Sequence, residues 1–286
     1  MNTKEEIRQQ IRTDYAGIAQ ANEGGGCCAG ACGVTESIDA GDLAQQIGYT
    51  KEELQALPAD ANMGLSCGNP AAIASLQAGE TVLDLGSGGG FDIFLAGPKV
   101  GSAGRAIGID MTPEMIDKSR RNIEQYKKST GLSNVEFRLG EIEHLPVADG
   151  SVDVVLSNCV LNLSMDKQRV WDEISRVLKP GGRIAISDIA LLKPLPEEVK
   201  SIVESWAGCV AGAIPVETMR EQMINAGLSD AQLTPKPAYV QALTDADDPL
   251  YAKISAMLPD GTSAADVITS VDISARKSCG CGPGCC

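Results

Sequence analysis

The chain has 286 residues and a formal net charge of −14, from 24 Lys and Arg against 38 Asp and Glu. This acidic balance argues against nucleic acid and membrane surfaces as partners, because both are anionic and require a basic face. The single histidine, His144, argues against a histidine-based zinc site or a Ser-His-Asp triad. The sequence offers no apolar run of membrane-spanning length and begins without the apolar stretch of a signal peptide, so we expect a cytoplasmic protein.

Apolar periodicity predicts the elements in chain order. A helix is expected over residues 3–20, and the glycine-rich stretch 24–33 is expected to be a loop. Five strands are then expected over residues 81–85, 105–110, 135–139, 152–156 and 183–187, with helices beginning near Phe91 and Pro113 and over 167–178. Strands separated by helices predict an α/β protein with a doubly wound, parallel sheet. Beyond residue 190 we expect helices near 196–212 and 216–226, then short strands.

A glycine loop directly follows the first predicted strand, over Asp84–Gly90. Its glycines let the backbone turn tightly and approach a ligand closely. Asp110 ends the next strand, where a carboxylate accepts hydrogen bonds from a ribose diol. Phe91 occupies the position of the third glycine of a dinucleotide loop, which argues against a nicotinamide oxidoreductase and favours a cofactor without a pyrophosphate.

These features resemble class I S-adenosylmethionine methyltransferases. The resemblance implies a Rossmann-like fold, S-adenosylmethionine as cofactor, and an in-line methyl transfer to a substrate. It also implies a set of cofactor-binding residues. The residues expected to line the methionine end are Asp84, Gly86, Ser87 and Gly88. Asp110 is expected to hold the ribose, and the adenine is expected to be flanked by Met111, Glu141 and Ile142. Asn158 is expected to stand where the methyl donor faces the substrate, and Tyr15 is expected to close over the cofactor.

Ten cysteines are unusual for a chain with no export signal, and we expect them to be reduced. They form an N-terminal group (Cys27, Cys28, Cys32), a dispersed group (Cys67, Cys159, Cys209) and a C-terminal group (Cys279, Cys281, Cys285, Cys286). Cys159 follows the fourth strand, so we expect it beside the glycine loop, at the carboxyl ends of the strands. The dispersed cysteines come from remote segments that can converge there.

Three interpretations of the dispersed cysteines are open on the residues alone. A free cysteine is commonly a small buried hydrophobe. Structural zinc sites favour close Cys-x-x-Cys pairs, and none occurs among Cys67, Cys159 and Cys209. Thiolates also select soft ions, and trivalent arsenic is soft and three-coordinate. Three neutral thiols that exchange with its hydroxides leave a neutral complex.

The motifs together resemble the arsenite methyltransferase family over roughly residues 10–230. They are Asp14-Tyr15, Ser66–Pro70, Asp84–Gly90, Asp110–Met115, Gly140–Pro146, Ser157–Cys159 and Gly208–Gly212. The resemblance implies that Cys67, Cys159 and Cys209 bind As(III) as the catalytic metalloid site. It implies that Cys32 is a redox partner for a binding-site cysteine, with Cys27 and Cys28 as open alternatives. It also implies arsenite and methylarsenite as substrates, and glutathione or thioredoxin as reductant.

This interpretation divides the chain into four regions. They are a helical, Cys-rich N-terminal cap (1–60), an S-adenosylmethionine-binding domain (61–192), a C-terminal arsenic-binding α+β region (193–277) and a disordered Cys-rich tail (278–286). We expect a monomer that detoxifies arsenic. Two competing functions are a methyltransferase of another small molecule, with incidental cysteines, and a metalloid-binding protein without turnover. Whether the tail gathers arsenite or is dispensable is open.

Overall fold

The computed structural model describes residues 4–20, 40–58, 60–200, 210, 212–245 and 248–279. The strands are β1 (Thr81–Leu85), β2 (Arg105–Asp110), β3 (Val135–Leu139), β4 (Val152–Asn158), β5 (Leu178–Leu191), β6 (Leu228–Lys236) and β7 (Ile268–Lys277). The helices are α1 (Lys4–Gln20), α3 (Ala40–Gln46), α4 (Lys51–Ala56), α5 (Pro70–Ala74), α6 (Phe91–Val100), α7 (Pro113–Thr130), α8 (Lys167–Val177), α9 (Glu197–Lys200), α11 (Val216–Asn225), α12 (Pro237–Asp245) and α13 (Pro249–Ala256). Short 3-10 turns cover Leu161–Leu163 and Ala264–Asp266.

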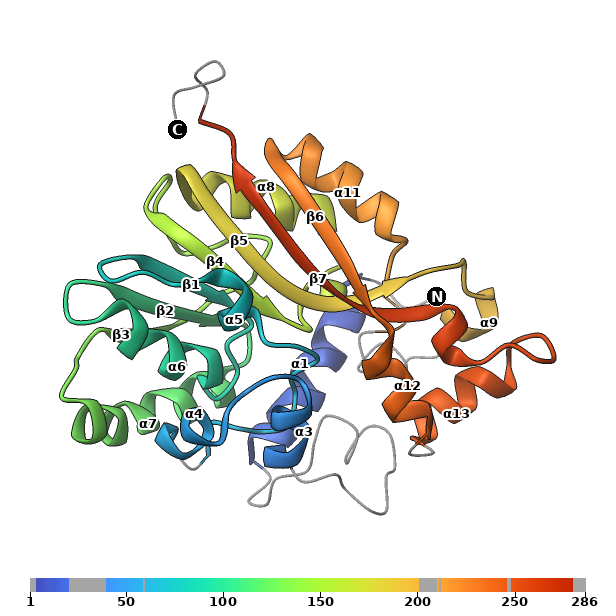
Figure 1. Ribbon diagram of the computed structural model, residues 1–286, viewed down its shortest axis with the longest axis horizontal. Coiled ribbons are helices and arrows are strands. Elements are labelled where there is room, and N and C mark those ends of the chain that lie inside the picture. Colours follow the sequence, from blue (N-terminus) through green and yellow to red (C-terminus); the bar gives the residue numbers. More distant parts are fainter. Residues whose placement is uncertain are drawn as a thin grey trace.

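The seven strands form one sheet in the order β3-β2-β1-β4-β5-β7-β6. The first five are parallel, which confirms the predicted doubly wound sheet. β7 pairs antiparallel with both β5 and β6. The last two strands therefore extend the same sheet, although they lie in the region predicted as a C-terminal α+β unit (Figure 1).

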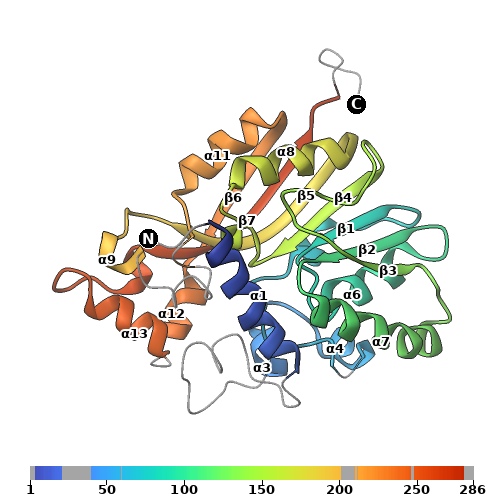
Figure 2. The same ribbon diagram turned by 180° about the vertical axis from the view of Figure 1, so that it is seen from behind.

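Helices cover both faces of the sheet, as the alternation along β1 requires. Val82 belongs to a core with α5, α6 and α7, whereas Leu83 and Leu85 belong to a core with α8 and α11. A third, smaller core lies around α12 and α13, and Cys67 is part of it. Figure 2 shows α1 below the strands, with α12 and α13 on one side of it and α6 and α7 on the other.

β5 is longer than predicted. We expected a strand over 183–187 that begins after a break at Pro180, but the strand runs over Leu178–Leu191. Pairing with β4 passes from Leu178 to Arg183 across a register shift. Gly181, at φ 77°, supplies the left-handed conformation that this irregularity needs. Pro180-Gly181 is therefore accommodated as a bulge within the strand.

No helix within the described residues combines the length and the apolar character needed to span a bilayer. The longest of them, α7, has 18 residues and carries charged side chains along its length.

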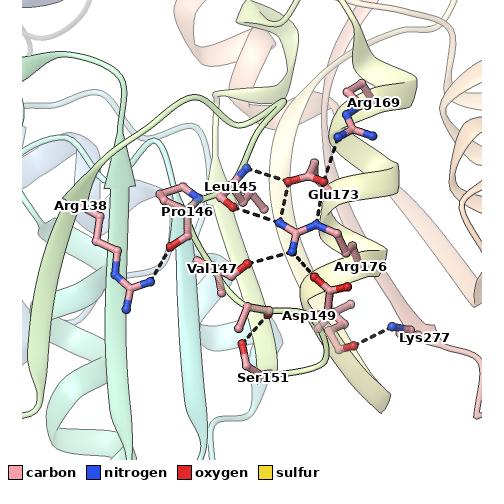
Figure 3. Close-up of polar contacts among 12 residues, drawn as sticks. Arg138, Leu145, Pro146, Val147, Asp149, Ser151, Arg169, Glu173, Arg176 and Lys277 are labelled. Carbon is pink, nitrogen blue, oxygen red and sulfur yellow. Dashed lines mark hydrogen bonds and ion pairs between the residues drawn. The ribbon is translucent and has the colours of Figure 1, made fainter.

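An ion pair between Glu173 and Arg176 of α8 fixes the loop 145–149 to that helix (Figure 3). The Glu173 side chain is only 4% exposed and accepts the Leu145 N–H at 2.7 Å. Arg176 donates to both carboxylate oxygens of Glu173, at 2.8 and 2.7 Å, and to the carbonyls of Leu145 and Val147. The hydrogen bonds from Arg176 lower the pKa of Glu173, against the opposing effect of burial.

Glu173→Gln is expected to destabilise the protein by roughly 2 kcal/mol at pH 7, because a charged hydrogen-bond acceptor is lost. The lowered pKa means that this stabilisation is present above the unfolded-state pKa and is lost as pH falls through the folded-state value. Urea unfolding should therefore show a higher free energy of unfolding for the wild type than for Glu173→Gln, with a difference that shrinks below about pH 4. Glu221→Gln, at an exposed position of α11, is the control. Equal unfolding curves at pH 7 would contradict this role.

Candidate functional site

A pocket opens at the carboxyl ends of β1, β2 and β4. It holds about 800 Å³ of empty space, open mouth included, which is within the range of small-molecule sites. Its wall includes Arg8 and Tyr15 from α1. The other lining residues are Leu65, Gly86, Gly88, Asp110, Met111, Thr112, Met115, Gly140, Ile142, Glu143, Asn158, Cys159, Val160, Leu163, Ser164 and Met165. A second cavity shares Gly86, Gly88 and Asn158 with it and adds Asp84, Ser87 and Asp92.

The glycine loop is shaped for close approach. Gly86 has φ 68°, and a Cβ there would lie 2.3 Å from Cγ2 of Val160. Gly88 also has a positive φ, of 50°. Ser87 is buried, and its hydroxyl has no hydrogen-bond partner among the described residues. The loop therefore presents backbone and one unsatisfied hydroxyl to whatever fills the cavity.

Asp110 links this loop to the start of α7. Its carboxylate accepts the Gly88 N–H at 3.0 Å and the Thr112 N–H at 2.8 Å. Burial raises the pKa of Asp110, and these backbone donors oppose the rise. The carboxylate is thus held at the pocket wall with acceptor capacity to spare, since each oxygen can accept more than one hydrogen bond.

The predicted adenine segment lies on the same pocket, with one difference. Met111 and Ile142 line the cavity, as does Tyr15. The Glu141 side chain instead forms an ion pair with Arg12 of α1 and lies 4.0 Å from Arg8. Glu141 therefore joins α1 to the segment that follows β3, beside the pocket.

Asp84 lies deeper, in the second cavity. Burial raises its pKa well above the usual value, and the nearby Asp92 and Asp110 carboxylates add to the rise. Sequence reasoning missed Asp92, which is buried in the first turn of α6. An acid inside the otherwise apolar run Phe91–Gly97 is the signal that points to it.

Cys67 and Cys159 meet beside the pocket, but as a disulfide, with a Cα–Cα distance of 6.1 Å. Our expectation that these thiols are reduced is therefore wrong for this state of the protein. The physical reason is convergence: β4 ends next to the turn that precedes α5, within bridging distance. Cys159 lines the pocket together with Gly86 and Gly88, which confirms its predicted place beside the glycine loop.

The loop that carries Cys159 is fixed from β5. Cys159 has a left-handed φ of 57°, and its N–H donates to the Ser187 carbonyl at 2.9 Å. The buried Asp188 accepts from the Leu161 N–H and from the Asn162 amide, both at 2.9 Å. Burial raises the pKa of Asp188 to about 6, against these donors. Asp188 was also missed, because its partners are remote in sequence.

Of the remaining cysteines, the structure describes one. Cys27, Cys28, Cys32, Cys209, Cys281, Cys285 and Cys286 lie outside the described residues. Cys279 is described and is disulfide-bonded; it lies near Gly181, at the end of β5 away from the pocket. Within the described ranges no group of three His, Cys, Asp or Glu side chains is arranged to hold a metal. The predicted three-cysteine site thus has two of its members placed, in oxidised form.

The methyltransferase-domain family matches residues 76–247, more than half of the chain. The chain belongs to the methyltransferase-domain family. It is 47% identical over 85% of its length to an arsenite methyltransferase of Halobacterium salinarum, and 41% identical over 46% of its length to one of Homo sapiens. It covers 62% and 37% of those relatives, less than two thirds of either.

Solved structures agree on the fold of this methyltransferase. An arsenic (III) S-adenosylmethionine methyltransferase of Chlamydomonas reinhardtii aligns with a TM-score of 0.60 and 29% identity, over 87% of this chain and 76% of that one. Phosphoethanolamine N-methyltransferase 2 of Haemonchus contortus aligns with a TM-score of 0.59 and 18% identity, over 84% and 60%. The second likeness shows the fold alone.

The methyltransferase fold supports S-adenosylmethionine as the cofactor, and the residues present fit it. The pocket lined by Gly86 and Gly88, the unsatisfied Ser87 hydroxyl and the Asp110 carboxylate suit a ligand with a polar amino-acid end and a ribose diol. Asp84 and Asp92 are the carboxyl groups of the second cavity, and a cationic ligand there would favour their charged forms.

Asp110→Ala is expected to raise the dissociation constant of S-adenosylmethionine about 10- to 100-fold, because it removes a charged acceptor for the cofactor. Isothermal titration calorimetry measures it, and circular dichroism checks the fold. Asp117→Ala, at an exposed position on the same helix α7, is the matched control. An affinity within twofold of wild type would remove Asp110 from the cofactor site.

Proposed function

We propose that this methyltransferase transfers a methyl group from S-adenosylmethionine to trivalent arsenic. The observation that carries the proposal is the meeting of Cys67 and Cys159, from segments 92 residues apart, at the wall of the cofactor pocket. The names of the relatives from Halobacterium salinarum, Homo sapiens and Chlamydomonas reinhardtii support the same substrate.

Thiols suit this substrate. As(III) is a soft ion that prefers sulfur ligands. Once reduced, Cys67 and Cys159 supply two thiols, and Cys209 is proposed as the third. Each thiol displaces one hydroxide of arsenite and releases one water, so the bound complex is neutral and its burial in an acidic protein carries no charge penalty.

The protein's contribution to the reaction is positioning and exclusion of water. S-adenosylmethionine, when bound, supplies an electrophilic methyl group. Cys67 and Cys159 hold the arsenic lone pair near the pocket wall, which is lined largely by apolar side chains such as Met115, Val160 and Leu163. No proton has to leave the nucleophile, so no general base is required, and His144 stays without a catalytic role. Positioning of this kind is worth several kcal/mol.

Electron balance explains the disulfide. Gain of a methyl cation leaves arsenic oxidised by two electrons. Attack of one cysteine thiolate on an arsenic-bound sulfur forms a disulfide and leaves the As–S electron pair on arsenic, which returns it to the trivalent state. A Cys67–Cys159 disulfide is a product of this step. Glutathione or thioredoxin is proposed as the external reductant, with Cys32 as an internal redox partner.

Repeated cycles would convert arsenite to mono- and dimethylated products and so detoxify arsenic. We propose that the protein acts as a monomer in the cytoplasm on arsenite and methylarsenite.

The oxidised protein is expected to be inactive, because both placed ligands are in a disulfide. Protein, arsenite and methyl-labelled S-adenosylmethionine should yield methylated arsenic only after glutathione or a thioredoxin system is added. Chromatographic separation of arsenic species measures this. Arsenite binding without methylated product would indicate a metalloid-binding protein. Methylation of an organic acceptor, unaffected by blocked thiols, would indicate another small-molecule methyltransferase.

Cys159→Ser is expected to reduce arsenite methylation at least about 100-fold, because a hydroxyl does not replace a soft thiol ligand. S-adenosylmethionine should still bind with near wild-type affinity. Cys279→Ser is the matched control, since Cys279 lies at the opposite end of β5. Full methylation activity of Cys159→Ser would refute the thiol site while leaving the methyltransferase assignment intact.

A further inference from the structure

The turn at Cys67 and Gly68 is held by hydrogen bonds from remote elements. The Cys67 N–H donates to Oδ1 of Asn158 at 3.0 Å, and Nδ2 of Asn158 donates to the Gly68 carbonyl at 2.8 Å. The Ser270 hydroxyl of β7 donates to the Cys67 carbonyl at 3.2 Å. A Cβ at Gly68 would lie 2.4 Å from the Ser187 hydroxyl. The backbone of Cys67 therefore has little freedom.

Tyr49, between α3 and α4, completes this arrangement from a third direction. Its hydroxyl donates to Oδ1 of Asp92 at 2.7 Å and lies 3.3 Å from the Gly68 carbonyl. Nδ2 of Asn158 lies 3.4 Å from both the Tyr49 hydroxyl and Oδ2 of Asp92. The ring is 3% exposed and packs edge-on against Phe91, with centroids 4.7 Å apart. The four polar groups form one buried network.

Electrostatics keeps each group in one role. The pKa of Tyr49 is raised well above its usual value, mainly by burial and next by the Asp92 carboxylate, so the Tyr49 hydroxyl remains a donor. Burial raises the pKa of Asp92 to about 6, while hydrogen bonds from Tyr49 and Asn158 favour its charged form. The other ionisable groups that act on Asp92 are Lys99 of its own helix, Glu53 of α4 and Asp84 of β1. Ionised Asp92 fixes the amide orientation of Asn158.

We propose that Tyr49 is a positioning residue that, through Asp92 and Asn158, holds the sulfur of Cys67 at its working place beside Cys159. The consequence for methylation rests on the proposed function. The positioning itself does not, because it acts on the cysteine pair whatever the substrate.

The first test measures the cysteine pair without arsenic. Reduced protein is equilibrated with glutathione and its disulfide; closure of Cys67–Cys159 releases two thiol hydrogens and converts one oxidised glutathione to two reduced ones. Quantified mass mapping of the Cys67 and Cys159 peptides gives the effective concentration of the pair. Tyr49→Phe should lower this effective concentration about five- to tenfold, because the Cys67–Gly68 turn samples more positions once it loses the Tyr49 hydroxyl.

Tyr126→Phe is the matched control, because Tyr126 is also a buried tyrosine, and its hydroxyl donates to Asn134 remote from the cysteines. It should leave the effective concentration within twofold of wild type. Asp92→Asn, which removes the charge but keeps the side-chain shape, should also lower the effective concentration of the cysteine pair. It replaces Tyr49→Phe in the test if that variant does not fold. An unchanged effective concentration in a folded Tyr49→Phe or Asp92→Asn protein overturns the proposal.

The second test uses methylation. Tyr49→Phe should lower kcat about tenfold with the S-adenosylmethionine dissociation constant changed less than twofold. Loss of the Tyr49 donor also raises the pKa of Asp92, so the acidic limb of the kcat profile moves to higher pH, whereas Tyr126→Phe leaves it in place. A kcat loss matched by Tyr126→Phe, or an unmoved limb, would mean a merely structural tyrosine. An inactive wild type would instead refute the proposed function, and the first test would still decide the role of Tyr49.

Discussion

The Asn158 side chain is the point on which the site depends. It ends β4, lines the pocket and bonds both sides of the Cys67–Gly68 turn. An amide is suited to this place because it donates and accepts at once, and both functions are used here. A carboxylate would lose the donor to the Gly68 carbonyl, and an apolar side chain would leave buried backbone groups unsatisfied.

The parallel sheet explains why the chemistry collects at one edge. β1 and β4 are neighbours, so the glycine loop after β1 and Cys159 after β4 emerge side by side. Crossover connections put α6 and α7 on one face and α8 on the other, and the pocket lies between these layers at the carboxyl ends of the strands. The antiparallel strand β7 then adds the C-terminal side of the site, since Ser270 reaches the Cys67 carbonyl.

Buried acids line the floor of this edge. Asp92 and Asp110 stand close enough to Asp84 to raise its pKa, in addition to the effect of burial. Such a cluster is unfavourable in isolation and becomes favourable beside a cationic ligand. None of the residues that line the second cavity has a cationic side chain. The acidity of the site and the choice of a positively charged methyl donor are thus consistent.

The sequence by itself determined the parallel strands, the glycine loop, Asp84, Asp110 and the position of Cys159, because each follows from residues within a few positions of one another. Tertiary structure alone decided that Tyr49 binds Asp92, that Asp188 holds the Cys159 loop and that Cys67 and Cys159, expected to converge as thiols, meet as a disulfide. It also decided that β6 and β7 join the sheet antiparallel. These contacts join segments tens to hundreds of residues apart, and local periodicity carries no information about which remote partner satisfies a buried polar group.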